Sequence, residues 1–246
     1  MRKLRFLVPP GALSGGAGAE VDLPEEEARH LAVTLRAQPG LQVFLFDGAG
    51  EEWKGEVVEA TRKRASVRLR ELETASVESP LRVVVYQAVS LERVFEESIE
   101  PLTALGVAAI VPLLTERSRT RSPDAKRIGR WRRIAGEASK LSFRRIVPRI
   151  EEPQEVSAIG PVGADTRRLL LDPDAVPGSF RAALTAPAPG AVELAAGPEG
   201  GFAPQEIAHL LSRDFFPVCL GPRILRTQLA APAALSILMA AWSDMA

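Results

Sequence analysis

The sequence predicts an α/β domain with a mainly parallel sheet, preceded by a small β-barrel-like unit. After Pro80, five short apolar runs rich in Val, Leu and Ile alternate with helix-like segments, as is typical of a parallel sheet buried on both faces. Before that point, alternating apolar and polar residues indicate half-buried strands. We therefore expect two domains, residues 1–75 and residues 80–246, joined by the stretch TASVESP.

The N-terminal unit is expected to contain one helix and several strands. PEEEARHLAVTLR predicts a helix over residues 24–36, because Pro24 and acidic residues fill its first turn and Arg36 lies at its far end. LQVFLFDG predicts a strand that ends in an Asp-Gly turn. The segments 54–60 and 65–72 alternate as further strands do.

In the larger domain, the apolar runs predict the strands of the sheet. Its predicted strands cover residues 81–89, 108–113, 168–172, 191–197 and 216–221. Ligands of parallel sheets bind at the carboxyl ends of the strands, and three of these strands end in the loops LLLDPDA, AAGPEGGF and CLGPRILR. The apolar run 229–242 predicts a buried helix, because it is shorter than the roughly 20 residues of a membrane span.

Composition indicates a cytoplasmic globular protein. Hydrophobic residues make up 46% and charged residues 25% of the chain, which suffices for a sizeable core. The single cysteine, Cys219, excludes an internal disulfide and fits a reducing compartment; within the apolar PVCLG it is expected to be a small buried hydrophobe. MRKLRFLVPP lacks the apolar stretch of a signal peptide, and we expect no membrane segment.

Charge is balanced overall but unevenly distributed. The formal net charge is zero, yet residues 117–149 hold twelve Lys and Arg against Asp124 and Glu137. A second basic cluster, TRKRASVRLR, occupies residues 61–70. Two interpretations stay open from composition: solvated faces, or a basic surface that faces nucleic-acid phosphates.

The most specific local pattern is AAGPEGGFAPQEI. Gly197, Gly200 and Gly201 follow a predicted strand and precede a helix, and glycines there let a ligand approach the backbone closely. The spacing matches neither Gly-x-Gly-x-x-Gly nor the P-loop, so a simple tight turn is the alternative. The loop LGPRILRTQLA also joins a strand to a helix, and Ile224 and Leu225 would give it an apolar wall. Together the two loops predict a site for a small ligand.

GPEGGF followed by LGPRILRTQLA resembles the C-terminal signature of the SPOUT methyltransferases. Within them it is most similar to the RsmE family, which methylates N3 of a uridine in 16S ribosomal RNA. ALGVAAIVPLLTERS, RWRRIAGEAS with RRIVPRI, and RHLAVTLRAQPGLQVFLFDGAG resemble further segments of that family. The resemblance implies a PUA-like β-barrel, a SPOUT domain with a trefoil knot, S-adenosylmethionine (AdoMet) as cofactor, and a homodimer that acts on 16S rRNA or the small ribosomal subunit.

The same resemblance implies site residues. Those expected to bind AdoMet are Leu171, Gly197, Pro198, Glu199, Gly200, Gly201, Leu220, Gly221, Ile224, Leu225 and Arg226. Those expected to touch RNA are Arg2, Arg5, His30, Arg36, Arg64, Arg117, Arg119, Arg144 and Arg145.

Methyl transfer to a ring nitrogen requires alignment of the reacting atoms, and it needs no metal and no covalent intermediate. The uracil N3 proton must leave and the resulting anion must be stabilised. Arg226 and Gln228 are the candidate catalytic residues, with Arg226 stabilising the anion or placing a phosphate. Alternatively, Arg226 is paired with a carboxylate. Glu199 suits a base and a loop-holding role equally.

The chain departs from the family pattern at Gln228, where the family has Glu, at Ser90-Leu91-Glu92 and at Ser139-Lys140. A neutral amide cannot act as a carboxylate base. Two alternatives therefore stay open: a SPOUT enzyme that acts on a ribose 2′-oxygen or guanine N1, and a weakly catalytic RNA- or ribosome-binding relative.

Overall fold

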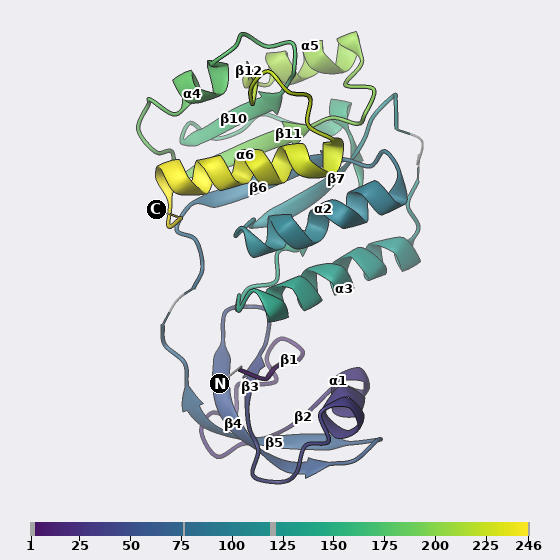
Figure 1. Ribbon diagram of the computed structural model, residues 1–246, viewed down its shortest axis with the longest axis vertical. Helices are drawn as coiled ribbons and strands as arrows, with labels where there is room; N and C mark the ends of the chain where they lie inside the picture. The colour runs from purple at the N-terminus through teal and green to yellow at the C-terminus, as the bar shows by residue number, and fades with distance from the viewer. Residues whose placement is uncertain (1–2, 76, 119–121, 246) are drawn as a thin grey trace. The chain divides into compact units, whose positions relative to one another are not determined.

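The computed structural model describes residues 3–75, 77–118 and 122–245, which fold into two compact units (Figure 1). Unit 1 comprises residues 1–78 together with residues 139–147, and unit 2 comprises the remainder. The first boundary falls within the predicted linker. Residues 139–147, however, belong to unit 1, although the sequence pattern placed them in the second domain.

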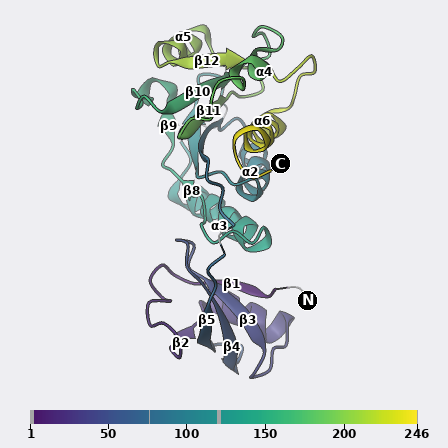
Figure 2. The same ribbon diagram turned by 90° about the vertical axis from the view of Figure 1, so that its left-hand side faces the viewer.

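Unit 1 is built on a five-stranded sheet in the order β1-β3-β4-β5-β2. β1 lies parallel to β3, and the other neighbours are antiparallel. The sheet curls (Figure 2) around a core that includes the fully buried Leu31, Val43, Leu45 and Leu69. The strands are β1 Arg5–Leu7, β2 Glu20–Asp22, β3 Gln42–Phe46, β4 Glu52–Ala60 and β5 Ala65–Leu72.

The helical segment of unit 1 differs from the regular helix predicted over residues 24–36. An α-helix, α1, covers Glu25–Arg29, and a wider π-helical turn, η1, continues over His30–Thr34. Leu31 in this turn is fully buried. Arg36 has a φ of 50°, and this left-handed conformation ends the helical path.

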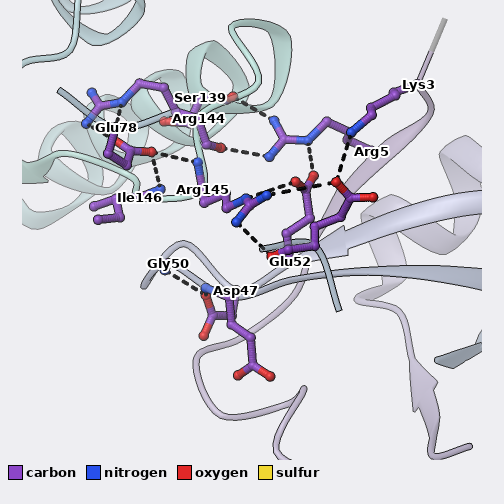
Figure 3. Close-up of polar contacts among 12 residues, drawn as sticks. Lys3, Arg5, Asp47, Gly50, Glu52, Glu78, Ser139, Arg144, Arg145 and Ile146 are labelled. Atoms are coloured by element: carbon purple, nitrogen blue, oxygen red, sulfur yellow. Dashed lines mark hydrogen bonds and ion pairs between the residues drawn. The ribbon is translucent and has the colours of Figure 1, made fainter. Parts of the chain in front are cut away.

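A buried arginine network, defined as Arg5, Glu52, Glu78, Arg144 and Arg145, holds residues 139–147 within unit 1 (Figure 3). Glu52 accepts hydrogen bonds from Arg5 Nε at 2.7 Å and from Arg145 Nε at 3.1 Å. Glu78 accepts from Arg144 Nη2 at 2.9 Å and from the Arg145 N–H at 2.8 Å. Arg5 Nη2 also donates to the carbonyl of Arg144 at 2.8 Å.

The network compensates charges that are removed from water. Arg5 is 4% exposed and Glu52 3% exposed. Burial lowers the pKa of the Arg5 guanidinium, and the hydrogen bond to Glu52 opposes that shift. Buried charges are tolerated only when each has a partner, so the network explains why a distant segment of the chain folds into unit 1.

Unit 2 contains a seven-stranded sheet in the order β12-β10-β11-β6-β7-β8, with β9 also paired to β7. All of its pairs are parallel, so the α/β class with a mainly parallel sheet is confirmed. The strands are β6 Arg82–Ala88, β7 Ala109–Leu114, β8 Arg149–Ile150, β9 Gln154–Glu155, β10 Thr166–Leu171, β11 Ala191–Ala196 and β12 Phe215–Val218.

Helices cover the sheet of unit 2. α6 and α2 run side by side along it (Figures 1 and 2), and α3 packs on α2 through the rings of Phe95 and Trp131, 4.4 Å apart. A buried cluster that includes Tyr86, Phe202 and Leu210 joins α5 to the strands. The helices are α2 Glu92–Ala104, α3 Ala125–Leu141, α4 Ser179–Ala183, α5 Pro204–Ser212 and α6 Thr227–Trp242, with a 3-10 turn, η2, at Val156–Ala158.

α6 is the apolar helix that the sequence predicts, but it is not buried on all sides. Ala231 and Leu235 are fully buried, whereas Leu229 is 53% and Ile237 39% exposed. One face therefore packs in the core of unit 2 and the other remains accessible. In the described part of the chain, none of the helices has the length and apolar character required to cross a bilayer.

Candidate functional site

The carboxyl ends of five neighbouring strands of unit 2 lie in register. Successive positions across β12, β10, β11, β6 and β7 are taken by Val218, Leu171, Ala196, Gln87 and Pro112. The loops that follow these residues therefore leave the sheet along one edge. This edge brings together the loops that the sequence singles out, since those after β11 and β12 start on either side of the loop after β10.

The glycine loop, residues 197–201, makes a tight turn after β11. The Gly201 N–H donates to the carbonyl of Pro198 at 2.8 Å, and Gly201 has a φ of 70°, a conformation that side chains rarely adopt. A Cβ on Gly197 would lie 3.1 Å from the ring of Phe202. Glycine is thus required at 201 by conformation and favoured at 197 by space.

Two neighbouring loops hold the glycine loop. After β6, Ser90 Oγ donates to Glu199 Oε1 at 3.0 Å. After β7, Arg117 Nη1 donates to the carbonyl of Gly200 at 2.5 Å. The bond to Ser90 ties Glu199 into the loop, which supports its loop-holding role.

The start of α5 is tied to the loop after β7. Glu206 accepts from the N–H of Ala203 at 2.7 Å and from the N–H of Glu116 at 2.8 Å. Gln205 in turn contacts the carboxylate of Glu116. The glycine loop, the α5 terminus and residues 115–118 therefore form one connected structure.

The second predicted loop covers residues 219–226. Gly221 has a φ of 130°, and Cys219 is buried, as expected for a small apolar residue. Ile224 is 86% exposed, so its apolar side chain is available to a ligand. Leu220 and Leu225 are half-buried beside it.

Arg226 occupies the N-cap position of α6. Its carbonyl accepts from Leu229 and Ala230, at 2.8 and 3.0 Å, while its side chain is exposed. Within the described residues its guanidinium has no carboxylate partner. The alternative in which Arg226 is neutralised by an acid is therefore not what the structure contains.

Gln228 lies in the first turn of α6 beside a carboxylate of another helix. Its Nε2 donates to Glu97 Oε2 on α2 at 3.3 Å, and Glu97 Oε1 is paired with Arg93 Nε at 2.8 Å. The neutral residue at position 228 thus has an acid beside it. Sequence spacing gave no sign of this contact, because 131 positions separate the two residues.

Gln87 is a candidate site residue that sequence reasoning missed. Its side chain is fully buried, and neither its amide nitrogen nor its amide oxygen has a hydrogen-bond partner among the described residues. Ala196 and Pro112, its neighbours in register, have no polar side chain to offer. Unpaired buried groups of this kind cost about 1–3 kcal/mol, and they call for a ligand or water. The lone polar residue in LRVVVYQAV was the available signal.

The edge suits a small ligand with polar and apolar parts. Its loops offer backbone groups around Gly201 and Gly221 and the apolar side chain of Ile224, and strand β6 carries the unpaired amide of Gln87. Ligand sites commonly combine apolar walls with a few polar groups of this sort. Within the residues that the structure describes, no group of three or more His, Cys, Asp and Glu is arranged to hold a metal ion.

The residues predicted to touch RNA fall into three groups. His30, Arg36, Arg64 and Arg117 are exposed, although Arg64 is paired with Asp22 at 3.0 Å. Arg2 and Arg119 lie outside the described residues. The third group consists of Arg5, Arg144 and Arg145, which are buried and bonded to carboxylates. The prediction that these three arginines lie on an RNA-binding surface was therefore wrong.

Comparisons with known proteins match both units. Residues 77–239 match the family described as RNA methyltransferase domain, and residues 23–70 match the RNA methyltransferase PUA domain. With the strand-edge site described above, these matches define an RNA methyltransferase of two parts.

Relatives over nearly the whole chain specify the family further. Ribosomal RNA small subunit methyltransferase E of Synechocystis sp. is 34% identical over 227 residues, covering 89% of this chain and 72% of that protein. The protein of the same name from Mycobacterium tuberculosis is 33% identical, covering 94% of this chain and 90% of its own. The chain belongs to the family of ribosomal RNA small subunit methyltransferase E.

Solved structures agree. Ribosomal RNA small subunit methyltransferase E of Neisseria gonorrhoeae, bound to S-adenosyl methionine, has a TM-score of 0.90 and 31% identity, with both chains covered in full. A putative methyltransferase of Legionella pneumophila, with SAM bound, has a TM-score of 0.89 and 32% identity, covering 99% of this chain and 100% of its own. The expected SPOUT-type domain with a PUA-like unit is thereby confirmed, while the threading of the chain into a knot stays a prediction.

Proposed function

We propose that this protein transfers the methyl group of AdoMet to N3 of a uridine in small-subunit (16S) ribosomal RNA. The observation that carries the proposal is the single strand edge from which the two glycine-bearing loops start, in a chain of this methyltransferase family. An enzyme directed at a ribose oxygen or guanine N1, or a weakly catalytic relative, is the alternative.

The cofactor fits the residues at this edge. The Neisseria structure has S-adenosyl methionine bound, and the Legionella structure has SAM bound. In this chain the same molecule would be held through backbone groups and apolar contacts by the glycine loop, which includes Pro198 and Glu199, and by Leu171, Leu220, Gly221, Ile224, Leu225 and Arg226. Bound there, AdoMet supplies a methyl group on a positively charged sulfur. Glycine at 201 permits the loop conformation, and the exposed Ile224 supplies an apolar surface.

The chain must also manage the proton and charge of the base. The N3 proton would leave to water first, so negative charge develops on the uracil before transfer. The N3–methyl bond would then form as the sulfur–methyl bond breaks and S-adenosylhomocysteine leaves. Arg226, a cation with no acid partner in the described part of the chain, is proposed to stabilise that charge. Gln228 carries an amide in place of a carboxylate. We propose that Gln228 and Glu97, which are joined by a hydrogen bond, position the reacting groups beside Arg226.

We assign RNA binding to exposed cations, and we also propose that the chain associates with a second copy of itself. His30, Arg36 and Arg64 on unit 1 and Arg117 on unit 2 are proposed to contact phosphates or unpaired bases. The exposed apolar side chains of α6, Leu229 and Ile237, suit association with a second copy of the chain. We thus propose a cytoplasmic homodimer that acts on 16S rRNA or on the small ribosomal subunit.

Arg226→Ala tests the catalytic assignment. Loss of a group that stabilises transition-state charge lowers kcat by about 10²–10³-fold, whereas the AdoMet dissociation constant should change by less than about threefold, roughly 0.7 kcal/mol. Single-turnover rates and calorimetric titration measure the two quantities. Arg223→Ala, which removes an exposed cation from the same loop, is the control and should retain most of the rate. Equal loss of rate and cofactor affinity in Arg226→Ala would assign the residue to cofactor binding.

The substrate class is tested with labelled AdoMet and ribosomal particles. Small subunits from cells that lack the modification should accept one methyl group each, and large subunits should accept none. Measurable AdoMet binding without incorporation into either particle would favour the weakly catalytic alternative.

A further inference from the structure

Arg117 occupies an unusual position, because it lies across the glycine loop and yet faces solvent. Its Nη1 donates to the carbonyl of Gly200 at 2.5 Å. Its Cδ lies 3.4 Å from the point that a Cβ on Gly200 would occupy, and Nη1 lies 4.0 Å from the same point on Gly201. These are ordinary van der Waals distances, so the arginine lies directly against the glycine loop.

The charge of Arg117 is not neutralised within the described residues. Its recorded partner is a neutral carbonyl, and no ion pair joins it to an acid. The nearby acids are engaged elsewhere: Glu199 by Ser90, and Glu206 by two backbone N–H groups. Some other exposed arginines, such as Arg70 and Arg132, are by contrast each paired with a glutamate.

A guanidinium has five N–H donors in one plane, so the bond to Gly200 leaves several for another ligand. A planar fork of donors on a full positive charge matches a phosphate oxygen pair. Arg117 can therefore hold the carbonyl of the glycine loop and an RNA phosphate at the same time.

By holding both the glycine loop and a phosphate, Arg117 would connect the site of AdoMet with the site of RNA. The loop that carries Arg117 is also tied to the start of α5 through Glu116 and Glu206, so its backbone is anchored while the side chain reaches the glycine loop. A phosphate that orders the Arg117 side chain would also order the carbonyl that it holds. When one ligand orders a group that a second ligand needs, each raises the affinity for the other by the same factor.

We propose that Arg117 couples RNA binding to cofactor binding, acting as a positioning residue that joins an RNA phosphate to the glycine loop. This inference rests on the proposed function, since it takes RNA and AdoMet as the two ligands. It predicts that RNA tightens cofactor binding in the wild-type protein and that this effect depends on the charge at position 117.

The test measures binding without turnover. Equilibrium dialysis with labelled S-adenosylhomocysteine, which has no methyl group to transfer, gives its Kd with and without saturating unmodified small ribosomal subunits. Subunit binding is measured in parallel. In the wild-type protein the subunits should lower the Kd by about fivefold or more. In Arg117→Gln, which removes the positive charge, the ratio of the two Kd values should fall to about one.

Arg133→Gln is the matched control, because it removes an exposed α3 arginine for which no interaction is recorded within the described residues. It should keep the wild-type ratio even if the affinity for subunits falls slightly. A wild-type ratio in Arg117→Gln, or a ratio of one in the wild-type protein with both ligands bound, would overturn the inference and leave the proposed function standing. If wild-type protein binds no subunits, the proposed function fails, and the inference fails with it.

Discussion

Glu52→Gln is expected to destabilise unit 1 by about 3–5 kcal/mol, the range measured when one partner of a buried ion pair is removed. Glu52 is 3% exposed and is the carboxylate that Arg5 and Arg145 share, at 2.7 and 3.1 Å. An amide at this position cannot neutralise either guanidinium, and both would stay buried. Residues 139–147, which the network holds within unit 1, would then lose their main polar attachment.

The matched control for this prediction lies on the same strand. Glu56 also belongs to β4 and also pairs with an arginine, Arg70 at 2.9 Å, but that pair is largely exposed. Exposed pairs contribute about 0–1 kcal/mol, so Glu56→Gln should be nearly neutral. Urea unfolding followed by circular dichroism measures both variants. Equal stability of the two would show that the buried arginine network does not hold unit 1 together.

Gly201→Ala is expected to raise the AdoMet Kd about tenfold, and Gly201→Val more. Gly201 has a φ of 70°, and an L-residue in that region costs roughly 1–2 kcal/mol, where 1.4 kcal/mol corresponds to tenfold in affinity. The substituted loop would relax away from the conformation that the cofactor requires.

Gly200→Ala serves as the control because it changes the adjacent residue by the same methyl group. Gly200 is not in the positive-φ region, and its Cβ would meet Arg117 Cδ at an ordinary 3.4 Å. Calorimetric titration should therefore find its AdoMet Kd within about threefold of wild type, roughly 0.7 kcal/mol. An unchanged Kd in Gly201→Ala would place cofactor binding at another part of the strand edge.

Most of the fold could be predicted from the periodicity of the apolar residues and from the turn-forming residues between them. The five principal strands of unit 2 fall where apolar runs predicted them, because strands buried on both faces leave a continuous apolar signature. The glycine loop was also visible, since Gly201 meets a local conformational need. By contrast, the π-helical turn at His30–Thr34 was missed, because its sequence has the pattern of a regular α-helix.

The parts that could not be predicted depend on distant contacts. Arg144 and Arg145 lie in a basic run that looked like a surface, and only their bonds to Glu78 and Glu52 reveal them as buried. The acid beside Gln228 comes from Glu97 on another helix. A charge run records which residues are present, and it does not record which carboxylates the fold will bring to them.

The chemical identity of the modified nucleoside shows which atom of the RNA this protein methylates. Small subunits methylated by the purified protein from labelled AdoMet would be digested to nucleosides and separated by mass spectrometry. We expect to find the label in 3-methyluridine. Label in a 2′-O-methylated nucleoside or in 1-methylguanosine would contradict this expectation and assign the family's chemistry in this chain to a different atom.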